Sequence, residues 1–299
     1  MTSMKHRCNI NLAFGAGIIA GVLLFALLGQ FYTPYLPARQ VIASRLLPPT
    51  LSHPLGTDHL GRDTLSRLME GAGYSLFVGI LAVGLGAAGG TALGMIAGTF
   101  GRWVDEFVMR VIDFVMGFPI ILLAILVASV FGPGMRNSMT AIAVANIPIF
   151  ARLVRGNLLS LKEEEFVMAA RASGANTGWI LLVHLLPHLL TPLIIQGTVS
   201  LGTAILADAG LSYLGLGVQP PHASWGRMIY EARSFLSLDP WLAVFPGTTI
   251  AFTILGFNLL GDGLRDRFDP RGFQSFRKVK RRLKRRPDRD ETTRILASG

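Results

Sequence analysis

Six long apolar runs divide this chain, and they constrain its fold more than any other feature. Each is long enough to cross the roughly 30 Å hydrocarbon core of a bilayer as an α-helix. Backbone groups in lipid must be hydrogen-bonded within their own segment, so each run is predicted to be helical. The expected spans cover residues 10–30, 73–98, 108–131, 138–158, 190–214 and 241–262. The sequence therefore predicts an all-α polytopic membrane protein with six transmembrane helices.

The composition agrees with this interpretation. Apolar residues make up 51% of the 299 residues and charged residues only 15%, whereas soluble domains carry about 25% charged residues. The first apolar run follows a short basic segment, residues 1–9, and no small-residue cleavage site follows the run. We interpret it as an uncleaved span rather than a signal peptide. The single cysteine, Cys8, excludes an internal disulfide.

The net charge of +10 is concentrated at the C-terminus. Residues 265–299 contain 13 Lys/Arg and 5 Asp/Glu, which accounts for +8 of the total. A basic tail, residues 263–299, beside the last span is typical of a cytoplasmic anchor. With six spans, the basic residues Arg102, Arg152 and Lys162 fall on the same side as both termini, so we expect both ends in the cytoplasm. The tail lacks the aromatic pattern of a nucleic-acid binder, and we expect no nucleic-acid partner.

Three segments outside the spans are long enough to fold: residues 31–72, about 159–189, and 215–240. The chain contains no P-loop lysine, no GxSxG and no Cys/His zinc pattern, so we predict no catalytic residue, no metal and no cofactor. His184 and His188 are four residues apart but lack a third ligand. A second cluster could chelate a cation, although the turn chemistry of a folded loop explains it better; it comprises His53, Asp58, His59 and Asp63.

Glycines recur every four residues in the second apolar run. Gly86, Gly90, Gly94 and Gly98 would lie on one face of a helix. A stripe of small residues lets a second helix approach closely, so it predicts a packing seam.

Polar residues within the spans are candidates for function, because a charge at mid-bilayer costs about 2.5–3.5 kcal/mol on insertion scales. Asp208, in the fifth span, is a candidate for a translocation pathway, or it makes a structural hydrogen bond. Asn146, beside Pro148, either lines a path or lies where the helix bends. Asp113 is expected to pair with Arg110 near a helix end.

The segment EEEFVMAARASG, residues 163–174, places charge and small side chains between two apolar regions. Ser160 and Glu163 form a capping-box pattern, which predicts the start of a helix. Small and apolar residues then recur at helical spacing, and Gly174 is predicted to end the helix.

This segment resembles the cytoplasmic signature of the inner-membrane permease subunits of binding-protein-dependent ABC importers. That signature runs E-A-A, three residues, Gly, and about nine residues to an I-x-L-P ending. Ala169, Ala170 and Gly174 match it, and Pro187 closes it. Met168 stands where the family has Glu, although Glu165 supplies an acid three residues upstream.

Four longer stretches resemble the C-type permease of the dipeptide/oligopeptide/nickel branch: residues 53–68, 147–167, 211–229 and 257–271. The resemblance covers about residues 45–272 and implies the type I ABC importer permease fold, without enzymatic activity. It implies a heterodimer with a homologous second permease, two cytoplasmic ATP-binding subunits and a periplasmic or lipid-anchored solute-binding protein, in the lipid of a bacterial inner membrane.

The resemblance implies import of small peptides, either dipeptides and oligopeptides or glutathione-like solutes. Nickel and opine-type solutes remain alternatives within the same architecture. An integral membrane enzyme is a further alternative, but it would need a polar cluster at one membrane depth. The residues that the resemblance assigns to ATPase coupling are Glu165, Met168, Ala169, Ala170, Gly174, Ala175 and Pro187.

Overall fold

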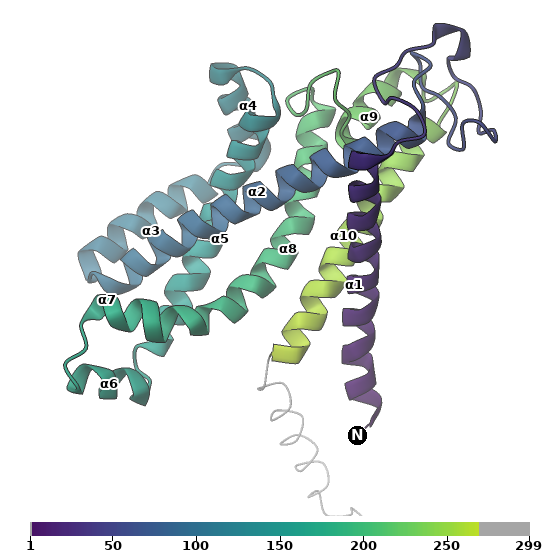
Figure 1. Ribbon diagram of the computed structural model, residues 1–299. Coiled ribbons are helices and arrows are strands. Elements are labelled where there is room, and N and C mark those ends of the chain that lie inside the picture. Colours follow the sequence, from purple (N-terminus) through teal and green to yellow (C-terminus); the bar gives the residue numbers. More distant parts are fainter. Residues whose placement is uncertain (1, 269–299) are drawn as a thin grey trace, which may run out of the picture.

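The computed structural model describes residues 2–268, which form helices and loops with one isolated β-bridge between Thr57 and Asp63 (Figure 1). Five helical segments are long and apolar enough to cross a membrane. They are α1 (Thr2–Phe31), α2 (Thr64–Thr99), α5 (Met135–Leu161), α8 (Leu186–Tyr213) together with the turns before it, and α10 (Trp241–Phe268).

The sixth apolar segment is a bent pair of helices. α3 (Arg102–Met116) and α4 (Ile120–Phe131) meet at an angle of 87°. The sequence pattern predicted one helix over 108–131, but α3 ends at Met116, with Gly117 as its C-cap, and Pro119 precedes α4. Proline offers no backbone N–H and keeps the residue before it out of the helical conformation, so the helix breaks here.

Other boundaries also differ from those expected. α2 begins at Thr64 rather than near residue 73, because the Asp63 side chain accepts a hydrogen bond of 2.8 Å from the Ser66 amide and caps the helix. The 31–72 loop also holds the short turn η1 (Ile42–Ser44). The 215–240 segment contains α9 (Trp225–Ala232) and η3 (Arg233–Phe235). Most of the predicted basic tail, residues 269–299, lies outside the described residues.

The predicted glycine seam on α2 is confirmed, and its partner is α5. A Cβ atom added at Gly90 would lie 2.5 Å from the Ile147 carbonyl oxygen, and one at Gly94 would lie 2.6 Å from that of Ala151. Gly86 faces Asn146 in the same way, and Gly98 faces Leu158. The two helices are therefore in close contact from Gly86 to Gly98, the C-terminal part of α2.

The short helices lie at opposite ends of the bundle. Figure 1 places the beginning of α1 and the end of α10 at the same end as α6 (Glu165–Ala172), while α9 lies at the other end beside the 32–63 loop. We call these the α6 end and the α9 end. Both described ends of the chain therefore lie at the α6 end, an arrangement that is compatible with the six-span prediction.

Candidate functional site

The segment between α5 and α8 folds back across the α6 end as three short helical elements. These are α6, then α7 (Thr177–Trp179), then the π-helical turn η2 (Ile180–Leu185) that leads directly into α8. The capping-box prediction is wrong, because Ser160 lies inside α5 and Glu164 precedes α6 without a side-chain cap. The reason is that Leu158 is fully buried and Leu161 packs beside it, so the apolar pattern extends α5 past Ser160.

One buried side chain anchors α6 to the bundle. Val167 is completely buried and packs against residues of α5, η2 and α8, among them Val154, Ile180 and Leu189. The Phe166 ring also stacks on His188, with ring centroids 5.1 Å apart. Sequence reasoning missed these anchors, because Phe166, Val167 and Met168 are consecutive apolar residues and nothing local shows which of them is buried. The contacts join α6 to two spanning segments as one packed unit.

The predicted coupling residues divide between two faces of this unit. Glu165, Ala169 and Gly174 are exposed, and Met168 is 55% exposed. Ala170 and Ala175 instead turn inward and pack against the cluster around Val167. The outer face of α6 therefore carries Met168 and Ala169 between an acid, Glu165, in the first turn and a base, Arg171, in the last turn.

Glycine is required at position 174 by the backbone. Its φ of +84° is left-handed, and a Cβ there would meet nothing within 4 Å among residues 2–268. The Gly174 N–H donates to the Arg171 carbonyl at 2.9 Å and the Ala175 N–H donates to that of Ala170 at 3.1 Å. These two bonds make a Schellman motif, whose apolar contact is the Ala170–Ala175 pair. The turn therefore leaves Gly174 exposed.

Pro187 is exposed near the start of α8, directly after η2. Near it, the His188 Nδ1–H donates to the His184 carbonyl oxygen at 2.7 Å. That bond and the Phe166 stack orient the His188 ring, which gives this histidine a structural role at the α6 end.

Ion pairs connect α3 to α5 near the same end. Arg155 pairs with Asp105, and the Arg152 guanidinium lies 2.6 Å from Asp113. The predicted Asp113–Arg110 pair is wrong, since Arg110 instead lies 3.8 Å from Glu106, one helical turn away. The packing of α5 against α3 places the Arg152 guanidinium, rather than that of Arg110, within ion-pair distance of Asp113.

The two candidate pathway residues are both buried. Asp208 is 0% exposed in α8, and neither carboxylate oxygen has a hydrogen-bond partner among the described residues. Asn146 is 4% exposed at the α2–α5 seam, where its amide donates to the Ile142 carbonyl at 2.8 Å and its oxygen is without a partner in the described chain. In this conformation both side chains are closed off from solvent, and a pathway role stays a prediction.

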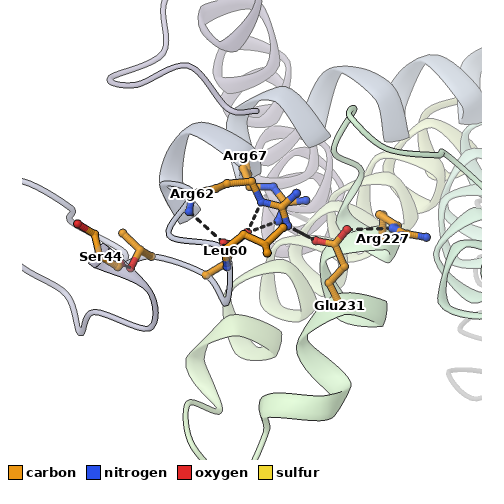
Figure 2. Close-up of polar contacts among 8 residues, drawn as sticks. Ser44, Leu60, Arg62, Arg67, Arg227 and Glu231 are labelled. Atoms are coloured by element: carbon orange, nitrogen blue, oxygen red, sulfur yellow. Dashed lines mark hydrogen bonds and ion pairs between the residues drawn. The ribbon is translucent and has the colours of Figure 1, made fainter. Parts of the chain in front are cut away.

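A cluster of charged residues at the α9 end was not predicted. Figure 2 shows Arg62, Arg67 and Arg227 directed toward Glu231, which comes from α9. Glu231 accepts from Arg62 at 2.6 Å, from Arg67 at 2.9 Å and from Arg227 at 3.0 Å. Asp58 binds Arg62 at 2.7 Å and Arg67 at 2.5 Å. We call these five residues the arginine cluster; it joins the 32–63 loop and the start of α2 to α9.

The loop acids take part in folding. Asp63 caps α2 and accepts from His53 at 2.8 Å, which favours turn chemistry over cation binding. Ligand atoms of Asp58, His59 and Glu231 do lie within 4.8 Å of one another. Both carboxylates, however, already face guanidinium groups, and those positive charges oppose a cation at the same place.

Comparison with known proteins identifies the family. The family model described as "binding-protein-dependent transport system inner membrane component" matches residues 90–273. That range includes α6, the Gly174 turn and all of α8. The chain belongs to this family. It is therefore a multi-pass component of an inner-membrane transport system and not an enzyme.

Curated relatives extend the similarity to nearly the whole chain. The dipeptide transport system permease protein DppC of Alkalihalophilus pseudofirmus is 46% identical over 257 residues, which is 86% of this chain and 84% of the relative. The glutathione transport system permease protein GsiD of Salmonella typhimurium is 45% identical over 267 residues, 89% and 88% of the two chains.

A solved structure supports the fold independently. Inward-facing MetNI, a methionine ABC transporter, matches with a TM-score of 0.56 at 19% identity, over 67% of this chain and 95% of the matched chain. At this identity the likeness shows the fold alone, and it agrees with the type I permease fold expected from the sequence.

Proposed function

We propose that this chain is the permease subunit of an ABC importer of small peptides, dipeptide- or glutathione-like, and that it forms one half of the translocation pathway. The observation that carries the proposal is the 45–46% identity to DppC and GsiD over 86–89% of the chain. The second half of the pathway is a homologous permease, and energy comes from two ATP-binding subunits that contact this chain.

The structure of the α6 end supports docking of an ATP-binding subunit there. The exposed face of α6 carries small side chains, which allow close approach, while Val167 fixes the helix to α5 and α8. A displacement of α6 would be transmitted to both spanning helices, because the buried side chains around Val167 join α6 to α5 and α8 and close-packed elements shift together. On this proposal both termini are cytoplasmic, and the α9 end faces the solute-binding protein.

The bent α3–α4 pair supports a neighbour within the membrane. Its exposed side chains are large and apolar, with Phe107 71% exposed, Phe114 69% and Phe131 73%. A surface of this kind contacts lipid or another apolar surface rather than water. In a heterodimer within a bilayer, the second permease and the surrounding lipid are the two partners that this α3–α4 surface can contact.

ATP-dependent uptake tests the proposed function. The chain is co-expressed with the second permease, both ATP-binding subunits and the solute-binding protein of the same transporter, and the complex is reconstituted in proteoliposomes. We expect ATP-dependent accumulation of labelled alanyl-alanine or glutathione. Accumulation of ⁶³Ni²⁺, with neither peptide transported, would overturn the peptide assignment but keep the permease role. The complex can also hydrolyse ATP in response to its ligand-loaded binding protein and yet accumulate neither peptide. That result would count against both peptides as substrates.

A further inference from the structure

A cleft of about 700 Å³ opens at the α9 end, between the 32–63 loop and the α9–η3 segment. The loop contributes Gln40, His59 and Arg62 to its walls, and the α9–η3 segment contributes Arg227, Tyr230 and Arg233. None of its lining residues belongs to a membrane-spanning helix. The cleft is therefore built by the parts of the chain that lie outside the bilayer.

The charges around this cleft do not balance. Four arginines, Arg233 and the three of the arginine cluster, stand against two acids, so the region carries a net charge of +2. Glu231 and Asp58 are already bound by those three arginines. Arg233 forms no ion pair with any residue of the described chain, and its side chain is exposed.

Aromatic contacts hold the guanidinium groups in place. The Arg233 guanidinium lies 4.1 Å from the centre of the Tyr230 ring, and that of Arg227 lies 4.7 Å from it. Across the cleft, the His59 ring stacks on Phe235 at 4.9 Å. Burial lowers the pKa of His59, against the opposing effects of Asp58 and Glu231, and so favours the neutral ring.

This arrangement suits a planar anion. A guanidinium presents paired N–H groups that match the two oxygens of a carboxylate, and a group already positioned by stacking loses less conformational freedom on binding. A cation would be repelled by the unpaired Arg233. A neutral solute would leave that charge without a partner.

We infer that this cleft is a carboxylate-binding site in which Arg233, held on Tyr230, receives the anion from outside the membrane. The inference rests on the proposed function, which places the α9 end on the side where solute is delivered. Two sources supply a carboxylate there: an acidic side chain on the surface of the solute-binding protein, and the carboxylate of the peptide itself.

The experiment uses the complete transporter in nanodiscs and compares wild type with Arg233→Gln, Arg233→Lys and Arg136→Gln. Arg136 is the matched control, because it is also exposed, lies at the start of α5 at the α9 end, and forms no ion pair in the described chain. One arm measures the Kd of the labelled solute-binding protein for the transporter. The other arm measures direct binding of alanyl-alanine and of its C-terminal amide.

We expect Arg233→Gln to weaken binding by about tenfold or more in one arm, since charge-assisted hydrogen bonds are lost. Arg233→Lys should fall between Gln and wild type, and Arg136→Gln should change binding less than about twofold, as expected for a single exposed charge. An effect confined to the binding-protein arm assigns the anion to that protein. An effect on alanyl-alanine that the amide does not share assigns it to the peptide.

Unchanged Kd values in both arms would overturn the inference, and so would an equal loss in Arg136→Gln, which would indicate general charge attraction only. The same preparation is tested for uptake. If the wild type transports peptide while Arg233→Gln binds both the solute-binding protein and alanyl-alanine normally, the inference of a carboxylate site is wrong and the proposed function stands. If wild type transports none of the solutes, the proposed function fails, whatever Arg233→Gln does in the binding arms.

Discussion

Replacing Gly90 with leucine should separate α2 from α5 and destabilise the permease by about 3 kcal/mol or more, because added bulk in a packed interface is accommodated only by moving backbone. A Cβ at this position would lie 2.5 Å from the Ile147 carbonyl oxygen and 2.6 Å from the Phe150 Cβ. Neither atom is the end of a flexible side chain. We expect a marked fall in the Tm of the purified permease in detergent, followed by intrinsic fluorescence.

The same helix provides the control. Gly84→Leu adds the same side chain where a Cβ would meet nothing within 4 Å, so its Tm should stay close to that of wild type. Equal shifts in the two variants would show that leucine disturbs α2 by some route other than the seam. A Gly90→Leu protein of unchanged Tm would contradict the close backbone contact itself.

Replacing Glu231 with glutamine should detach the 32–63 loop from α9, with a loss of about 3 kcal/mol, because three arginines then lose a shared and mostly buried counter-charge. The Glu231 side chain is 11% exposed, and those of Arg62 and Arg67 are 5% and 3% exposed. Hydrogen exchange should accelerate in the loop and α9 and remain unchanged around α6. In the control Glu106→Gln, an exposed carboxylate is removed from Arg110, and the change should stay within about 0.5 kcal/mol.

Acid should reproduce this effect in the wild type. Burial raises the pKa of Glu231, but the charges of Arg67 and Arg62 and hydrogen bonds from Arg227 and Arg67 outweigh burial and lower the pKa from 4.5 to about 2. A lowered carboxyl pKa stabilises the folded state above the unfolded value, and this stability is lost as pH falls toward the folded value. Protection of the loop should therefore decline between pH 4.5 and about 2. Glu231→Gln should lack this component, and an identical pH profile in both proteins would contradict the assignment.

Sequence patterns predicted the parts of this fold that depend on local periodicity. The apolar runs indicated the spanning segments, and the four-residue spacing of Gly86, Gly90, Gly94 and Gly98 indicated a seam. The break at Pro119 was missed because the apolar run continues through it, and apolar character alone does not show where a helix bends. Gly174 was placed correctly, because a glycine after a helical pattern is a local signal for its end.

Contacts between distant residues were beyond the reach of those patterns. Arg62 and Glu231 are 169 positions apart, and nothing in either neighbourhood points to the other. The same applies to the ion pair between Asp113 and Arg152, which replaces the locally expected pair with Arg110. It also applies to the Phe166–His188 stack. The exposed face of α6 was predicted from a family resemblance, whereas its anchor, Val167, emerged only from the packing of α5 against α8.

The central claim is that α6 transmits the movement of an ATP-binding subunit to the spanning helices, and Ala169→Asp tests it most directly. Ala169 is exposed, so the new carboxylate leaves the fold of this chain intact and acts only within an interface with a partner. Its control is Ala169→Ser, which is polar but small and uncharged.

The measurement is peptide uptake and ATP hydrolysis by the same proteoliposomes, with subunit content checked for each variant. We predict that Ala169→Asp lowers uptake by more than about tenfold, since an unpaired charge buried in an interface costs several kcal/mol. ATP hydrolysis should then no longer respond to the solute-binding protein, while Ala169→Ser keeps both activities. Full uptake and a normal ATPase response in Ala169→Asp would contradict docking at α6.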